Sequence, residues 1–296
     1  MKAGELDWVA NIVARSDLRA GAFIVTLFGD VVEPRGGRLA TRSIIEACRR
    51  VGLNASQVRT ALSRLVAAGR LEGTREGRRS HYRLTPLARA EFLSAARAIF
   101  APQRPSGWAI VWAPPGAEVE RLEARAGRIG PDFFLAPGDV AAPGCLVFSA
   151  GDPATPPLLQ RLARKLWPLQ ACEASYAEFE AMFAPLETAM ARGEDVAGET
   201  ALTLRLLLTH RFRAAALQDP GLPASALGAG WRGDTARGVF SALYLALSPA
   251  AEAAIPSLFS NGARPLSADA PTARERAAEL RRWLEPSAAR LAEPQA

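Results

Sequence analysis

Lysine is almost absent from this sequence. Its 296 residues include two lysines and 34 arginines. That imbalance, together with the excess of alanine and glycine, is typical of a protein encoded by a GC-rich genome. The formal net charge of +6 is therefore weak evidence of a nucleic-acid partner. The distribution of charge along the chain is more informative than its total.

Cysteine and histidine are also scarce. Cys48, Cys145 and Cys172 form no CxxC pair, so we expect reduced core thiols in a cytoplasmic protein and no disulfide framework. His81 and His210 are the only histidines, which argues against a metal site built from several imidazoles. We predict no metal and no cofactor.

Long apolar runs are missing as well. The stretch "ALTLRLLL" at 201–208 is shorter than the roughly 18 residues of a membrane span and contains Arg205. The start, "MKAGELDW", lacks the apolar segment of a signal peptide. The sequence has no phosphate-loop signature after Gly36 and Gly37 and no GxSxG motif. We therefore expect no membrane association and no enzyme activity.

The positive charge is concentrated in one segment. Residues 35–89 contain 13 arginines, no lysine and only three acidic residues, Glu46, Glu72 and Glu76, which gives a net charge of +10. The rest of the chain contains 23 basic and 27 acidic residues. Such a segment in an otherwise slightly acidic chain is typical of a protein with a polyanionic partner.

Helical patterns begin just before this segment. Apolar residues recur at helical spacing through 17–32, until Pro34 and the two glycines that follow it break the pattern. A second, short helix is predicted from Thr41 to about Arg50.

A third helix is predicted from Asn54 to Gly69. Asn54 and Gln57 have the spacing of a capping box, and Gly69 is a suitable helix terminator. The expected packing stripe consists of Val58, Leu62, Leu65 and Val66. The opposite face carries no acidic residue and consists of Ser56, Thr60, Ser63, Arg64 and Ala67, flanked by Gln57 and Arg59.

That outward face suits a helix that lies against DNA bases. Arginine reads guanine, glutamine reads adenine, and small side chains permit close approach. An ordinary solvated helix face is the alternative, but surface helices usually mix charges of both signs.

The next element is a predicted hairpin, made of "RLEGT" (70–74) and "SHYRLT" (80–85) around a turn at Gly77. We expect Tyr82 and Leu84 to point inward, and His81 to face solvent or phosphate. Helix, helix, turn, helix and basic hairpin is the order of a winged helix-turn-helix, in which the hairpin is the wing.

These patterns predict the residues that contact DNA. Base edges and nearby phosphates are assigned to Gln57, Arg59, Thr60, Ser63 and Arg64. Wing contacts to phosphates or a minor groove are assigned to Arg75, Arg78 and Arg79. Arg42 is either a phosphate clamp or simply solvated.

The remainder reads as two further regions. A helix is predicted to run to about Phe100, and the linker "APQRPSG" follows it. After the linker we predict a strand at 107–114, a helix at 116–128, two more strands and another helix. This order suits a ferredoxin-like domain. From Ser175 the chain is mainly helical. The tail 261–296 is expected to hold at most one short helix, near 272–284, and to have poorly ordered ends.

Two stretches resemble a known family. "TLFGDVVEPRGGRLATRSII" with "VRTALSRLVAAGRLEGTREGRRSHYRLT" is similar to the N-terminal domain of the PaaX family of transcriptional repressors, and "LLLTHRFRAAALQDPGLP" with "ALYLALSPAAE" resembles its C-terminal helical domain. The resemblance implies a homodimeric repressor on promoters for aromatic-acid degradation, released by phenylacetyl-CoA. It also implies a central domain related to Cas2 nucleases, although Ala113 stands where those enzymes place a metal-binding aspartate.

The predicted fold is therefore α+β, with an N-terminal winged helix-turn-helix, a central ferredoxin-like (Cas2-like) domain and a C-terminal helical domain. The expected boundaries are 15–88 for the DNA-binding domain, 89–105 for a connecting helix and linker, 106–172 for the central domain, 173–260 for the helical domain and 261–296 for the tail.

An aryl-CoA effector would need cations for its phosphates and an apolar pocket for its acyl group. The candidates are Arg205, His210, Arg211, Arg213 and Trp231, although packing or dimerisation would explain the same residues. The partners expected are double-stranded operator DNA, an aryl-CoA and a second copy of the chain. The alternatives are a repressor that responds to another acyl-CoA and a constitutive DNA-binding, dimerising regulator without an effector.

Overall fold

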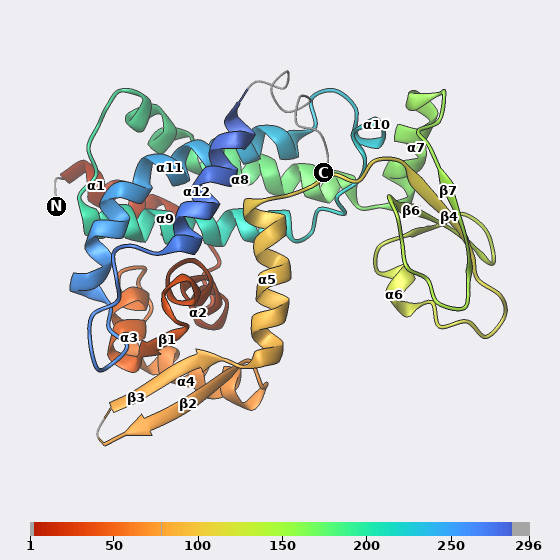
Figure 1. Ribbon diagram of the computed structural model, residues 1–296. Coiled ribbons are helices and arrows are strands. Elements are labelled where there is room, and N and C mark those ends of the chain that lie inside the picture. Colours follow the sequence, from red (N-terminus) through yellow and green to blue (C-terminus); the bar gives the residue numbers. More distant parts are fainter. Residues whose placement is uncertain (1–2, 78, 286–296) are drawn as a thin grey trace. The chain divides into compact units, whose positions relative to one another are not determined.

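The computed structural model describes residues 3–77 and 79–285 (Figure 1). The chain divides into two compact units: residues 1–101, 178–214 and 236–296 form the first, and residues 102–177 and 215–235 form the second. Each unit contains one small antiparallel sheet together with helices. The predicted α+β class is confirmed.

The first unit begins with helices. α1 (Ala3–Ala14), which the sequence patterns did not predict, precedes α2 (Ala20–Leu27). α2 continues as the π-helical segment η1 (Phe28–Val32) and the 3-10 turn η2 (Glu33–Arg35). The predicted break at Pro34 and the glycines is confirmed, because Gly36 ends this helical run with a φ of 91°.

The next two helices are α3 (Thr41–Arg49) and α4 (Ala55–Ala67). The predicted capping box is present: the Gln57 amide N–H donates to Asn54 Oδ1 over 3.0 Å, and the Asn54 N–H donates to Gln57 Oε1 over 2.8 Å. Val58 and Leu62 are fully buried, but Val66 is 40% exposed. The assignment of Val66 to the packing stripe is therefore wrong, because the buried face of α4 consists of Val58, Ala61 and Leu62.

The sheet of the first unit has three strands in the order β1-β3-β2. β2 (Leu71–Glu76) and β3 (Arg79–Leu84) are the predicted hairpin, in antiparallel register from Leu71 opposite Leu84 to Glu76 opposite Arg79. The sequence did not predict β1 (Arg38–Ala40), which pairs with the other edge of β3. α5 (Pro86–Phe100) follows, capped by the Thr85 hydroxyl.

The rest of the first unit is helical. It contains part of α8 (Leu169–Ala191), most of α9 (Gly198–Ala216) and α11 (Arg232–Leu258), and all of α12 (Pro271–Leu284). The helix predicted near 272–284 is α12, and the expectation of a poorly ordered end at 286–296 falls outside the described residues. Its packed core includes a row of aromatic rings in contact, those of Phe179, Phe183, Phe212, Phe240 and Tyr244.

α11 is longer than predicted, because it runs through Pro249 and Pro256 without ending. By length and composition α11 could cross a membrane, because the mean hydropathy of its most apolar window is 1.4. The search of the sequence for long apolar runs did not reveal this helix. Its apolar residues are accounted for in part by packing, since Phe240, Tyr244 and Ile255 are fully buried in the first unit. The helix is therefore weak evidence of a membrane segment.

The second unit is built on a sheet in the order β5-β6-β4-β7. Its strands are β4 (Trp108–Trp112), β5 (Gly127–Arg128), β6 (Phe133–Pro137) and β7 (Leu146–Ala150). The helices are α6 (Glu120–Glu123), α7 (Pro156–Leu166) and α10 (Ala224–Leu227), besides the start of α8. The helix predicted at 116–128 is thus only four residues long.

The strand directions of this sheet define a split β-α-β unit. β4 and β5 flank α6 and run parallel, and β6 lies between them, antiparallel to both. A ferredoxin-like fold has this arrangement and a second helix before its last strand. Here a loop connects β6 to β7 and the helix α7 comes afterwards, so the full ferredoxin-like assignment remains a prediction.

A loop near the C-terminus covers the edge of the first unit's sheet. We call residues 259–266 the clasp loop; an isolated bridge between Ser260 and Pro265 closes it. Its Ser260 carbonyl accepts from the Ala40 N–H over 3.0 Å, and its Gly262 carbonyl accepts from Arg79 Nη1 over 2.7 Å. The expectation that His81 faces solvent or phosphate is wrong: His81 is 2% exposed, and Gly262 packs against its imidazole ring.

Gly262 is required there for two reasons, which predicts a measurable cost for Gly262→Ala. Its φ is +93°, and an added Cβ would lie 1.8 Å from His81 Nε2. Gly36 is a matched control, because its φ is +91° and a Cβ there meets nothing within 4 Å. Gly36→Ala should lower the free energy of unfolding by about 1 kcal/mol and Gly262→Ala by roughly 2 kcal/mol or more. Equal losses in urea unfolding would show that the clasp loop is not packed on His81.

Candidate nucleic-acid interface

The outward face of α4 is exposed and carries no acidic residue. Ser56, Gln57, Arg59, Thr60, Ser63 and Arg64 are all exposed. The opposite face holds the helix in place through Val58, Ala61 and Leu62, which are buried. α2 and α3 pack against α4, so the outward side chains stand on a rigid base.

The Gln57 side chain helps to cap α4, in addition to its predicted contact with DNA. Its amide oxygen is occupied by the Asn54 N–H in the capping box. Its NH2 group remains available to an external acceptor, and its oxygen has a second lone pair that could accept from a base donor. Replacing Gln57 would therefore test helix stability and DNA contact together.

The arginines of residues 35–89 fall into two groups. Seven of them pair with carboxylates: Arg35 with Glu252, Arg38 with Glu76, Arg49 and Arg50 with Glu46, Arg70 with Glu91, Arg83 with Glu72, and Arg89 with Glu33. The hydrogen bond from Arg49 lowers the pKa of Glu46, and that from Arg38 lowers the pKa of Glu76.

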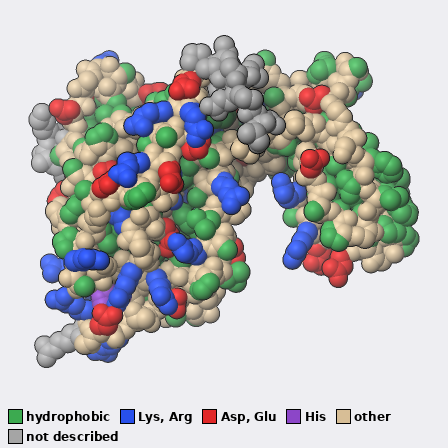
Figure 2. Space-filling view, viewed as in Figure 1, with side chains coloured by type: hydrophobic (Ala, Val, Ile, Leu, Met, Phe, Trp, Pro, Cys, Tyr) green, Lys and Arg blue, Asp and Glu red, His purple; other side chains and the backbone are tan. Residues whose placement is uncertain are grey.

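Five further arginines form no ion pair with any described residue, and all five are exposed: Arg42, Arg59, Arg64, Arg75 and Arg79. Arg78 lies outside the described residues. The arginines assigned to DNA from the sequence are thus the ones whose charge no carboxylate neutralises. Figure 2 shows Lys and Arg side chains over the part of the first unit where Figure 1 places β2, β3 and α3.

Two arginines of the β2–β3 hairpin are oriented by backbone carbonyls. Arg75 Nε donates to the Gly77 carbonyl over 3.1 Å, within the turn itself. Arg79 Nη1 donates to the Gly262 carbonyl of the clasp loop. A carbonyl orients a guanidinium without cancelling its charge, so both side chains keep the +1 charge that a phosphate would need.

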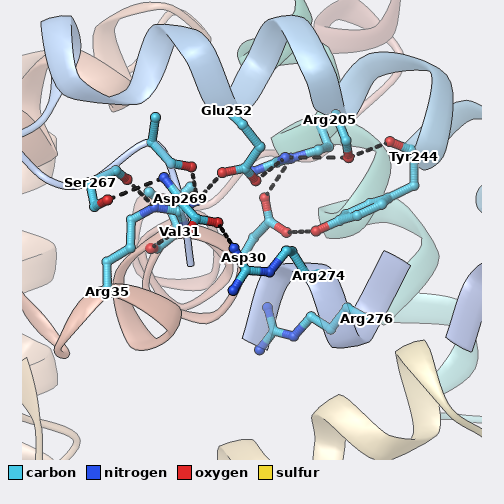
Figure 3. Close-up of polar contacts among 12 residues, drawn as sticks. Asp30, Val31, Arg35, Arg205, Tyr244, Glu252, Ser267, Asp269, Arg274 and Arg276 are labelled. Carbon is cyan, nitrogen blue, oxygen red and sulfur yellow. Dashed lines mark hydrogen bonds and ion pairs between the residues drawn. The ribbon is translucent and has the colours of Figure 1, made fainter. Parts of the chain in front are cut away.

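A buried polar network joins the first helices of this unit to its later ones (Figure 3). Arg205 on α9 is fully buried and donates from Nε to Asp30 Oδ2 over 3.0 Å and from Nη1 to Glu252 Oε1 over 2.6 Å. The Tyr244 hydroxyl donates to the other Asp30 oxygen over 2.7 Å. Arg276 on α12 donates to the Gly29 carbonyl over 3.0 Å. We call these contacts the Asp30 network.

The network keeps Arg205 charged. Burial alone would favour the neutral guanidine, but Asp30 and the other oxygen groups around it outweigh that effect and raise the pKa of Arg205. A charge this deep needs its partners, because removing one partner of a buried pair costs about 3–5 kcal/mol. Within the described chain Arg205 Nη2 has no hydrogen-bond partner.

The other effector candidates lie in separate environments. His210 is buried, and its Nδ1 lies 2.9 Å from Thr26 Oγ1 on α2. Arg211 pairs with Glu178, and burial lowers the pKa of Arg213. Trp231 is buried in the second unit against Tyr176. Arg205 and His210 therefore face α2 and η1, while Trp231 belongs to the other unit.

Reactive groups are few in the described chain. All three cysteines are free, and burial raises the pKa of the Cys48 thiol to about 12 and that of Cys172 to about 11. Among the described residues no three His, Cys, Asp or Glu side chains are grouped closely enough to hold a metal ion. Ala113 is buried at the end of β4 within an apolar cluster that includes Val111 and Phe134.

Comparison with known proteins identifies the family. Residues 19–88 match the PaaX-like protein family, and residues 167–256 match the PaaX-like protein C-terminal domain, so that the two matches span more than half of the chain. The chain belongs to the PaaX-like family. It is 29% identical over 255 residues to "Transcriptional repressor PaaX" of Escherichia coli strain K12, covering 78% of this chain and 81% of that protein.

A solved structure, that of the uncharacterized protein Rv0674 from Mycobacterium tuberculosis, shares 21% identity and a TM-score of 0.44 with this chain. The similarity covers 71% of this chain and 89% of that one. At this TM-score it carries no argument about function.

The Asp30 network and the contact between Thr26 and His210 connect the two segments that match the PaaX-like family. Thr26 and Asp30 lie in the first matched segment, while Arg205, His210 and Tyr244 lie in the second. The clasp loop and α12 lie beyond both matches. Sequence reasoning missed Asp30, although a signal existed: a lone acid in the apolar run 23–32 and a lone cation in "ALTLRLLL" are natural partners once buried.

His210 makes the stability of this unit depend on pH. Burial, assisted by Arg213 and Arg211, lowers the pKa of His210 to about 4. The unfolded chain takes up a proton near pH 6.5 and the folded one only near pH 4, so stability is complete above 6.5 and falls between 6.5 and 4, by about 2–3 kcal/mol. In His210→Gln, the free energy of unfolding measured with urea should lose this dependence on pH, which the wild type shows. Parallel profiles for the two proteins would mean that His210 does not titrate in this way.

Proposed function

We propose that this chain is a transcriptional repressor that binds double-stranded operator DNA through a winged helix-turn-helix. α3 and α4 form the helix-turn-helix, α4 lies in the major groove, and the β2–β3 hairpin is the wing. The observation that carries the proposal is the set of five exposed arginines without a carboxylate partner, placed on and around a helix face that has no acid. The similarity to a PaaX repressor supports it.

The regulated genes follow from the family resemblance. We propose that the operon encodes degradation of an aromatic compound of the phenylacetate type, and that an aryl-CoA thioester releases the repressor from DNA. The protein acts in the cytoplasm as a homodimer, with no enzyme activity of its own and no membrane partner. A repressor that responds to a different acyl-CoA, or a constitutive regulator without an effector, remains the alternative.

Dimerisation has a consequence for the operator. A single winged helix-turn-helix covers few base pairs, and a two-fold pair presents two α4 helices and two wings. The operator should then contain inverted half-sites separated by whole helical turns. The helical region 173–260 is the proposed pairing surface, and the second unit is proposed to be a ferredoxin-like, Cas2-like domain that lacks the nuclease metal ligand.

The phosphate contacts can be tested through salt dependence. Binding to a footprinted operator should weaken as salt rises, because each phosphate contact releases counterions. Removing Arg42 and Arg75 together should reduce the slope of log K against log salt by roughly 2, on specific and random duplexes alike. The matched control is Arg70→Ala with Arg83→Ala, since those side chains pair with Glu91 and Glu72. If both double variants change the slope equally, unpaired arginines have no special role.

Sequence reading can be tested at Arg64. Arg64→Ala should cost roughly 1–3 kcal/mol on the operator and much less on random DNA, because a base contact matters only where the base is correct. Arg49→Ala, which removes an arginine paired with Glu46 on α3, should have a small effect on both duplexes. Equal losses for Arg64→Ala on the two duplexes would assign that side chain to phosphates.

A further inference from the structure

A cavity of about 410 Å³ lies between α11 and the segment that leads into α12. We call it the α11–α12 cavity. Its volume falls within the range of small-molecule sites, about 300–1,000 Å³. Leu245 and Pro249 of α11 and Ala273 and Ala277 of α12 supply apolar walls. The α11 wall belongs to the segment that matches the PaaX-like family, whereas the α12 wall lies beyond it.

Two arginines on one side of α12 make the cavity attractive to anions. Arg274 and Arg281, seven residues apart and hence on one face of the helix, both line it. The Arg281 side chain has no hydrogen bond or ion pair with another described residue, and among these residues the Arg274 side chain pairs only with Asp269. Both members of that pair are about two-thirds exposed, at 64% and 66%. An exposed pair of this kind is weak, so a bound anion can replace Asp269.

The α11 wall of the cavity belongs to the Asp30 network. Ser248 and Glu252 line the cavity, and both accept from Arg205 Nη1, at 3.4 and 2.6 Å. The second Glu252 oxygen accepts from Arg35 in η2. Whatever moves Glu252 therefore acts on Arg205 and Arg35 at once (Figure 3).

Arg35 connects the other side of the cavity to the same helices. It donates to the Val31 carbonyl of η1 over 2.9 Å and to the Ser267 carbonyl over 2.7 Å. Ser267 directly precedes Ala268, which lines the cavity. η1 continues α2, and α2 packs on α4. A continuous set of contacts thus runs from the cavity to the proposed DNA-reading helix.

We propose that the α11–α12 cavity is the effector site, and this inference rests on the proposed function. It takes a molecule that combines anionic groups with a short apolar body: phosphates or a carboxylate bind Arg274 and Arg281, and the apolar part lies on the alanine and proline walls. An acyl-CoA thioester has this chemistry. Arg205 and His210 are buried and do not line the cavity, so they act as positioning residues.

Ligand binding alters DNA affinity only if the DNA-competent and DNA-incompetent arrangements of the protein differ in their affinity for the ligand. An anion near Arg274 repels the Glu252 carboxylate, which lines the same cavity. Separation of Glu252 from Arg35 loosens η1, and with it the base on which α4 stands. DNA-bound protein, in which that base is rigid, then binds the ligand more weakly by the same factor.

The test uses the full-length protein and matched pairs of variants on α12. Ala277→Leu fills the cavity, and Ala278→Leu places the same side chain at an exposed position outside its lining. Arg281→Ala removes a lining cation, and Arg282→Ala removes its neighbour, which pairs with Glu279. Calorimetry with phenylacetyl-CoA, free CoA and phenylacetate separates the acyl from the phosphate contribution, and circular dichroism confirms that each variant is folded.

Ala277→Leu and Arg281→Ala should each weaken phenylacetyl-CoA binding by about tenfold or more, equivalent to ~1.4 kcal/mol. Their controls should stay close to the wild type, and operator binding without ligand should be unchanged in all four. Amide hydrogen exchange of the wild type should report faster exchange at 28–35 when the ester is bound.

If the ester binds wild type and Ala277→Leu equally, the site is elsewhere while the effector function stands. If no CoA ester binds the wild type at millimolar concentration, the effector function and this site both fall. If binding leaves exchange at 28–35 unchanged, the route through Glu252 is wrong.

Discussion

The first unit depends on one buried ion pair, that between Arg205 and Asp30. Neither side chain is exposed, and the two belong to helices 175 residues apart in the sequence. An isolated charge at such depth would cost several kcal/mol, and its partner offsets that cost only when the geometry is good. Tyr244 donates to the second Asp30 oxygen, and Glu252 accepts from Nη1 of the guanidinium. The pair therefore fixes where α2 and η1 lie against α9 and α11.

A buried polar network specifies an arrangement more strictly than apolar packing does. Leucines slide past one another at little cost, whereas a carboxylate that leaves its guanidinium loses hydrogen bonds that no neighbour replaces. The helices that carry the proposed DNA-contacting residues are thus held in one orientation by groups far along the chain. The same groups border a cavity, so the orientation can respond to what the cavity contains.

Local features of the fold could be predicted from the sequence, and distant ones could not. The α4 capping box follows from Asn54 and Gln57 alone, and the β2–β3 hairpin from its alternation and Gly77, because these signals act within a few residues. β1 was missed because three residues show no period. His81 was misassigned because the loop that buries it lies about 180 residues later. The acid-free face of α4 is likewise a local property of the sequence, whereas the partners of Arg205 come from η1 and α11, which are far from it in the sequence.

The Asp30 network can form only after most of the chain has been synthesised. Gly29 and its Arg276 partner are separated by 247 residues, which a ribosome adds in roughly 12–50 s at about 5–20 residues per second. Until Arg205 is added, 175 residues after Asp30, this carboxylate has neither its guanidinium nor its tyrosine hydroxyl. The N-terminal part of a nascent chain is therefore incomplete until α12 has been synthesised, and any chain that stops before Arg205 carries an acid in its core that nothing neutralises. The first unit is therefore complete only when α12 at the C-terminal side of the described chain has been made.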